Sequence, residues 1–220
     1  MLIFLRRSVA APAKTLKQSC ARGALAIRRR RAAQTLKSFG RPMRLHLGCG
    51  PNYLPGWVNI DGNRELPRFD LCWNLEDGLP VPDASCDRIY SEHVLEHLSV
   101  DHAVALLKEC HRALAPRGVM RIAMPSLENI VAKYSSPDWK NQDWLTWPAF
   151  QSIATRAEMI NVSFRWWGHQ WLYDREELHR RLSEAGFGEI ADVEWGVSRH
   201  DGLSGLETRR DSLLICEVMS

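Results

Sequence analysis

The sequence predicts an α/β fold in which helices cover both faces of a mostly parallel sheet. Predicted strands and helices alternate along the chain, as a doubly wound parallel sheet requires. The first strand, within residues 44–50, runs directly into a turn that contains two glycines. A second short strand, residues 57–60, ends at Asp61. With 220 residues, the chain has the length of one such domain and a tail.

The glycine turn indicates a binding site for a ligand. Gly48 and Gly50 allow the backbone to turn sharply and to approach a ligand closely, because neither has a Cβ. Asp61, at the end of the second strand, is placed to accept hydrogen bonds from ribose hydroxyls. Only a turn separates Gly50 from Asp61, and Tyr53 stands where the fingerprint G-x-G-x-x-G has its third glycine. These features argue against a dehydrogenase and leave open a different ligand that contains adenosine.

Periodicity and capping signals predict the later elements. Apolar residues at helical spacing over 103–114 predict a helix with Ser99 or Asp101 as its N-cap. A further helix begins after Asp174 and ends at Gly186. The last three predicted strands cover residues 119–124, 190–195 and 212–218.

Five motifs in order give the chain a family resemblance. They are LHLGCG, the acidic NID, NLEDGLPVPDASCDRIY, SEHVLEHL and LAPRGVMRIAMPSLE, which together span residues 44–129. The chain resembles the class I S-adenosylmethionine-dependent methyltransferases of the type 11 branch. This resemblance implies a Rossmann-like methyltransferase fold with an antiparallel last strand, and S-adenosylmethionine as the cofactor.

The resemblance also assigns cofactor-binding roles by matched position. The candidates are Gly48, Cys49, Gly50, Asp61, Asn74, Leu75, Ser91, Glu92 and His93. The glycine turn would wrap the methionine part, Asp61 would hold the ribose, and Asn74 and Leu75 would contact the adenine. Ser91, Glu92 and His93 would face the reactive end of the cofactor. Asn74 stands where the family often has Asp. The Asn side chain keeps an acceptor oxygen and adds N–H donors.

Charge divides the chain into a basic leader, residues 1–41, and a methyltransferase domain, residues 42–220. Residues 1–44 hold twelve basic and no acidic side chains, whereas the remainder holds 17 basic and 26 acidic ones. We favour a basic amphipathic helix on an anionic membrane surface as the interpretation of the leader. A mitochondrial transit peptide is the alternative, followed by nucleic-acid contact or a solvated tail. The acidic body disfavours RNA at the active site.

The cysteines and the hydropathy pattern suggest a compartment. The six cysteines form no C-x-x-C pair, which is typical of reduced thiols in a cytosolic protein. No apolar run approaches the ~20 residues that span a membrane. We expect a cytoplasmic protein that is peripheral at the inner membrane, or a mitochondrial one if the leader is cleaved.

Residues 135–172 interrupt the alternation and contain six of the nine tryptophans. In the family, this part of the chain commonly forms the substrate cover. Indole rings suit stacking on sugars or bases, or a membrane interface, because they join a large apolar face to one N–H donor. The alternative is that they pack a small subdomain core, and both can hold. We expect a glycan, a lipid-linked molecule or a small molecule as the acceptor.

The histidines raise the question of a metal. Residues 93–97 match H-x-x-E-H, the pattern of the inverzincin zinc proteases. Inverzincins do not place that motif beside a glycine-turn nucleotide site, so we expect no zinc. The magnesium-dependent small-RNA methyltransferases have Glu at the position of His93 and a further His downstream, which makes the match poor. We therefore predict no metal, and we expect His93 and His97 to shape the methyl-donor pocket.

His169 and His93 are the candidate catalytic bases. His169 lies between the tryptophan cluster and a helix, and a near-neutral pKa suits a general base. A structural role is the alternative for each. The rival hypothesis for the whole chain is a non-catalytic cofactor-binding or scaffold protein on the same fold. It would predict degraded glycine and acidic positions, but Gly48, Gly50 and Asp61 are intact.

Overall fold

The computed structural model describes residues 11–219, which fall into two units, residues 1–38 and residues 39–220. In the first unit, helix α1 (Ala11–Leu36) confirms that the leader is helical, although helical periodicity separates its apolar and basic residues only weakly. The first ten residues, with the apolar start of the leader, lie outside the described residues. None of the described helices combines the length and the apolar character that crossing a membrane requires.

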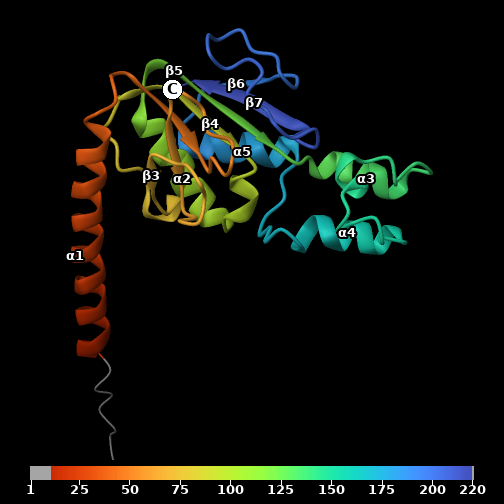
Figure 1. The fold of residues 1–220 in the computed structure, drawn as a ribbon, viewed down its shortest axis with the longest axis horizontal. Helices are drawn as coiled ribbons and strands as arrows, with labels where there is room; N and C mark the ends of the chain where they lie inside the picture. Colours follow the sequence, from red (N-terminus) through yellow and green to blue (C-terminus); the bar gives the residue numbers. More distant parts are fainter. Residues whose placement is uncertain (1–10, 220) are drawn as a thin grey trace, which may run out of the picture. The chain divides into compact units, whose positions relative to one another are not determined.

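The second unit is built on a sheet with the strand order β3-β2-β1-β4-β5-β7-β6 (Figure 1). The strands are β1 (Met43–Leu47), β2 (Val58–Asp61), β3 (Leu71–Cys72), β4 (Cys86–Glu92), β5 (Leu114–Met124), β6 (Glu189–Asp192) and β7 (Leu214–Met219). Strands β1 to β5 pair in parallel, and β7 is antiparallel to both of its neighbours. The predicted doubly wound sheet with an antiparallel last strand is therefore confirmed.

The helices follow the predicted capping signals. They are α2 (Val100–Ala113), α3 (Leu127–Ser135), α4 (Arg156–Arg165) and α5 (Arg175–Ala185), with short 3-10 turns η1 (Leu75–Asp77), η2 (Leu95–His97) and η3 (Asp143–Thr146). The Ser99 hydroxyl accepts a hydrogen bond from the first turn of α2, and Asp174 caps α5 in the same way. Gly186 ends α5 with a left-handed φ of 107°, a conformation that glycine adopts without strain.

A buried ion-pair network joins β5, β7 and the loop between β6 and β7, and nothing in the sequence pattern announces it. The Arg121 side chain is fully buried. Its Nε lies 2.5 Å from Glu207 Oε1, and its Nη1 lies 2.6 Å from Glu217 Oε1. Its other donors reach the carbonyl groups of Val197 and Glu194. With its donors paired, this charge holds the loop against the sheet.

The tryptophan-rich segment has a core of its own. Its buried residues are Trp139, Trp144, Leu145, Phe150 and Met159, with Trp147 and Trp167 packed against them. Trp166 and Trp171, in contrast, are exposed. Helix α4, within the segment, lies next to α3, which precedes it (Figure 1). The subdomain-core interpretation therefore holds for most of these tryptophans.

Candidate functional site

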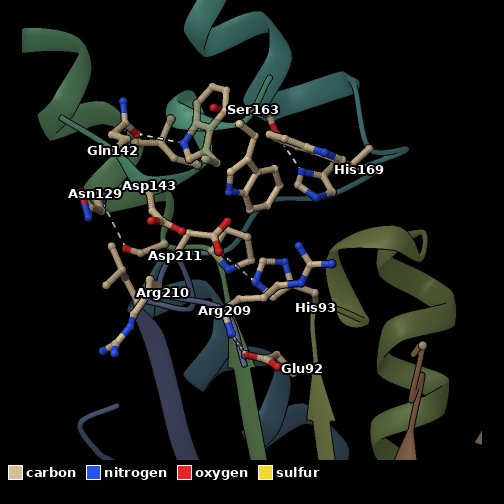
Figure 2. A pocket seen from close by; sticks show the side chains of 18 of the residues that line it. Glu92, His93, Asn129, Gln142, Asp143, Ser163, His169, Arg209, Arg210 and Asp211 are labelled. Carbon is tan, nitrogen blue, oxygen red and sulfur yellow. Dashed lines mark hydrogen bonds and ion pairs between the residues drawn. The ribbon is translucent and has the colours of Figure 1, made fainter. Parts of the chain in front are cut away.

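A cavity of about 490 Å³ opens at the carboxyl ends of β1 and β4. These two neighbouring strands are the point where the strand order reverses, which is where open α/β sheets bind ligands. The lining residues come from segments 46–52, 92–97, 125–133, 141–147, 163–169 and 209–213. Figure 2 shows Glu92 and His93 at the end of β4, with Gln142, Ser163 and His169 across from them.

Glycine is needed at the two positions of the turn after β1 for different structural reasons. Both adopt positive φ, 63° at Gly48 and 50° at Gly50. A Cβ on Gly48 would lie 2.5 Å from a Val94 methyl group, so this glycine lets the turn after β4 pack closely. A Cβ on Gly50 would meet nothing within 4 Å, and Gly50 lines the cavity. The second glycine therefore leaves open space where a ligand can lie.

Asp61 is tied directly to the glycine turn. Its Oδ2 accepts a hydrogen bond of 2.8 Å from the Gly50 N–H, and its Oδ1 accepts one from the Asn63 N–H. A carboxylate offers about four lone-pair sites, so each oxygen can accept a second bond, for example from a ribose hydroxyl. Open space over Gly50 beside this carboxylate fits the methionine and ribose parts of S-adenosylmethionine.

The predicted cofactor residues divide into two groups around the cavity. Gly48, Cys49, Gly50, Glu92 and His93 line it, whereas Asp61, Asn74, Leu75 and Ser91 do not. Asn74 accepts a hydrogen bond from the Glu76 N–H and caps η1, and Leu75 and Ser91 are buried. The cofactor contacts assigned to both groups stay predictions.

The Glu92 carboxylate binds a loop of its own chain. It accepts hydrogen bonds from Thr208 N and Oγ1, Arg209 N and Ser212 Oγ, at 2.7–3.1 Å. Burial raises the pKa of Glu92, but these hydrogen bonds together bring it below its ordinary value. Glu92 thus anchors the loop that carries Arg210 and Asp211 to the cavity (Figure 2).

The candidate base His169 lines the cavity and is oriented by the backbone. Its Nδ1 lies 2.7 Å from the Ser163 carbonyl oxygen, and because a carbonyl only accepts, Nδ1 is the protonated nitrogen. The lone pair therefore lies on Nε2. The ring centroid is 4.9 Å from that of His97, which also lines the cavity.

The second candidate base, His93, has neighbours at both ring nitrogens. Its Nε2 lies 3.2 Å from Ser212 Oγ, and its Nδ1 lies 3.2 Å from Glu96 Oε1. Its backbone takes a positive φ of 53°, which is uncommon outside glycine. The catalytic role of both histidines stays a prediction, and His93 has the stronger structural ties.

The opposite wall of the cavity combines indole rings with polar side chains. Trp144, Trp147 and Trp167 line it. Sequence reasoning missed polar residues that line the cavity on both sides. Asn129, Lys133, Asn141, Gln142 and Asp143 are examples, and Arg209 and Arg210 lie on the loop that Glu92 anchors. They come from three separate segments with no shared motif, so only the fold brings them together.

Comparisons with known proteins agree with this architecture. Residues 59–122 match the family described as "Methyltransferase domain". The fold is similar to a SAM-dependent methyltransferase, "possible histamine N-methyltransferase", from Thermotoga maritima, with a TM-score of 0.52 and 13% identity over 84% of this chain and 86% of that one. A SAM-dependent methyltransferase from Archaeoglobus fulgidus has a TM-score of 0.49 and 17% identity over 94% and 99%. Comparison with curated proteins yields no match.

Proposed function

We propose that this chain, which matches the methyltransferase-domain family over residues 59–122, is a class I S-adenosylmethionine-dependent methyltransferase of the type 11 branch that methylates a hydroxyl group of a glycan acceptor. One observation carries the choice of acceptor. A single cavity has the glycine turn on one wall and a row of indole rings with polar side chains on the other. A donor bound at the first wall and a sugar bound at the second would meet inside it.

The residues of the second wall suit a sugar. The flat faces of the partly exposed Trp147 and Trp167 can pack against the C–H face of a pyranose ring. Amide and carboxylate groups from Asn129 and Asp143 can pair with its hydroxyls as donors and acceptors. A purely apolar acceptor would leave these polar groups unpaired.

The chemistry requires positioning and removal of one proton. When bound, S-adenosylmethionine supplies a methyl group that its sulfonium activates. The glycine turn and Asp61 would hold the cofactor, and the indole wall would bring the acceptor oxygen into line. The hydroxyl proton would leave at the histidine wall, where His169 keeps the lone pair of Nε2.

The first experiment measures cofactor binding by calorimetry. S-adenosylmethionine and S-adenosylhomocysteine are titrated into the wild type, Asp61→Ala and the control Asp83→Ala, whose side chain is exposed. We expect saturable binding that Asp61→Ala weakens by ~10-fold or more, because hydrogen bonds to the ribose are lost, and that the control leaves unchanged. A folded wild type that binds neither ligand would favour the scaffold alternative.

The second experiment tests the acceptor. Formation of S-adenosylhomocysteine is measured with free and lipid-linked oligosaccharides, small alcohols and RNA oligonucleotides. We expect turnover with the sugars, and a KM for the sugar that Trp147→Ala raises and Trp166→Ala, a change at an exposed indole, does not. Turnover with RNA or small alcohols alone would contradict the proposal.

We also propose that the leader, residues 1–41, recruits the enzyme to an anionic membrane surface where lipid-linked glycans lie. Its basic side chains and lack of acidic ones support electrostatic attraction. Co-sedimentation of the full chain with anionic vesicles, compared with a variant whose residues 28–31 are changed to Gln, tests this idea. N-terminal sequencing of the mature protein tests the transit-peptide alternative, which requires cleavage in the leader.

A further inference from the structure

Glu96, in the turn η2 that follows β4, is a buried carboxylate without a hydrogen bond. Its side chain is 1% exposed, and neither oxygen has a hydrogen-bond partner among the residues that the structure describes. The His93 ring lies beside it, with Nδ1 at 3.2 Å from Oε1 but outside hydrogen-bond geometry. An ionised carboxylate in such a place needs a compensating charge.

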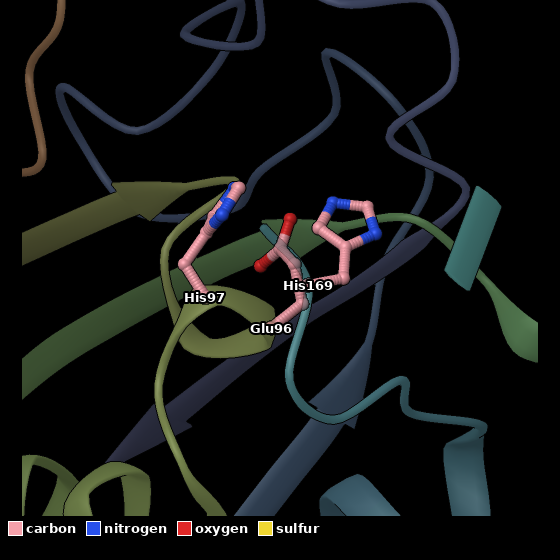
Figure 3. A group of neighbouring side chains, drawn as sticks. All are labelled: Glu96, His97 and His169. Carbon is pink, nitrogen blue, oxygen red and sulfur yellow. The ribbon is translucent and has the colours of Figure 1, made fainter. Parts of the chain in front are cut away.

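Two imidazole rings lie beside this carboxylate. Ligand atoms of Glu96, His97 and His169 all lie within 4.8 Å of one another, and Figure 3 shows the carboxylate between the two rings. Glu96 and His97 are neighbours in η2, whereas His169 comes from the loop between α4 and α5. Two segments of the fold, rather than one helix face, therefore make this cluster.

The backbone holds the two halves of the cluster together. The Gln170 N–H donates to the Glu96 carbonyl oxygen at 2.7 Å, and the Gln170 side chain donates to the His97 carbonyl oxygen at 2.6 Å. The second of these bonds joins residues 73 positions apart, and together they set His169 next to η2. The approach of His169 to Glu96 is therefore built into the fold.

The orientation of the rings suits metal ligands. A histidine that binds a metal through one nitrogen usually donates its other N–H to a carbonyl or carboxylate. His169 does this, since Nδ1 donates to the Ser163 carbonyl oxygen and Nε2 keeps its lone pair. His93, held by Ser212, packs against the Glu96 carboxylate, with Nδ1 3.2 Å from Oε1.

We propose that Glu96, His97 and His169 form a binding site for a divalent transition-metal ion of the zinc class. Two imidazoles and one carboxylate are a ligand set for such ions, and three protein ligands leave a further coordination position open. Bonds of about 2.1 Å place tetrahedral ligand atoms roughly 3.4 Å apart, so small rotations of the two rings close the cluster around an ion. His97 and His169 line the cavity, so the open position faces it.

The site gives the proposed methyl transfer a means of activating the acceptor, and this consequence alone rests on the proposed function. An acceptor hydroxyl in the open position would lose its proton more readily, because a bound cation lowers the pKa of its oxygen ligand. The O–H bond breaks, the electron pair stays on the oxygen, and the proton passes to solvent. His169 would then act as a ligand and not as the base.

The test is metal binding to the tag-free full chain. Zinc is titrated in competition with a chromophoric chelator, and the bound metal is counted by mass spectrometry after desalting. The variants are His169→Gln and Glu96→Gln, with His102→Gln as the matched control, because His102 is half exposed and pairs with Glu76 outside the cluster. Cobalt substitution adds a visible spectrum that reports the coordination.

We expect one zinc per chain in the wild type and in His102→Gln. Losing a residue that hydrogen-bonds to a metal ligand typically lowers metal affinity 10–100-fold. Losing the ligand itself, as in His169→Gln, should therefore lower zinc affinity by ~100-fold or more. Equal affinity in the wild type and His169→Gln, or no binding by the wild type, overturns the site. Glu96→Gln changes a buried residue, so His169→Gln, checked for folding by circular dichroism, is decisive. Calorimetry with S-adenosylmethionine on the same samples reports the proposed function separately.

Discussion

Two buried carboxylates lie four residues apart, Glu92 at the end of β4 and Glu96 in the following turn, and their surroundings differ completely. The Glu92 carboxylate accepts hydrogen bonds from two backbone N–H groups and two hydroxyls of one loop. The Glu96 carboxylate accepts none from the residues that the structure describes and faces the imidazoles of His93, His97 and His169. The Glu92 carboxylate has its lone pairs filled by hydrogen bonds from its own chain, and the Glu96 carboxylate has lone pairs that no such bond fills.

The difference separates a structural charge from a site. A buried carboxylate whose lone pairs are filled acts as an anchor, because its neighbours would be left unpaired if it were removed. One whose lone pairs are open is complementary to a cation. Arg121, with Glu207 and Glu217, is the positive counterpart of Glu92, since it is buried and paired. Glu92, Glu96 and Arg121 are all buried, so burial alone does not distinguish the structural charges from the site.

The largest effect should come from Arg121→Leu. Removing this guanidinium leaves Glu207 and Glu217 buried without their partner, which we expect to lower the free energy of unfolding by about 3–5 kcal/mol. Urea unfolding measures it. Arg180→Leu removes an exposed pair with Glu177 and should cost at most about 1 kcal/mol. Similar losses in the two variants would show that the buried network stabilises the fold no more than an exposed ion pair does.

Glu92→Gln should have the next largest effect. The amide group places N–H donors against the donors of Thr208, Arg209 and Ser212, so we expect a loss of about 3 kcal/mol in the free energy of unfolding. Proteolysis should cut the released loop faster. Glu184→Gln, at a more exposed pair, serves as the control. A variant as stable as the wild type would refute the role of Glu92 as an anchor.

Acid should weaken the wild type more steeply than Glu92→Gln. The folded pKa of Glu92 is lowered, so its stabilisation is complete above its unfolded pKa of about 4.3 and is lost as pH falls through the folded value. Urea unfolding at several pH values from about 5 to 3 compares the two proteins. Parallel curves would mean that Glu92 has the same pKa in both states.

The smallest effect should come from Glu96→Gln in a chelator. The contact with the His93 imidazole is weakened, so we expect a smaller loss in the free energy of unfolding than in Glu92→Gln, about 1 kcal/mol. Added zinc should then stabilise the wild type and not the variant. A loss in chelator as large as that of Glu92→Gln would remove the contrast between the two carboxylates.

Much of the fold and half of the site could be predicted from the residues. The strand that leads to Gly48, the acid at Asp61 and the caps Ser99 and Asp174 are local signals, and the structure bears each of them out as structural elements. The family resemblance added the antiparallel last strand, which periodicity alone does not show. His169 was singled out for its place beside the tryptophans, and it does line the cavity.

The tertiary structure decided which chemistry each of these residues can perform. The partners of Glu92 lie more than 100 positions away, and the loop with His169 meets η2 across 73 positions. The sequence predicts no metal at H-x-x-E-H, because the motif stands beside a glycine-turn nucleotide site and has His93 where the magnesium enzymes have Glu. Only the fold brings His169, from outside the motif, to Glu96 and His97. A local pattern specifies backbone conformation, since caps and turns act over a few residues. Which lone pairs remain open depends on side chains that only folding brings together.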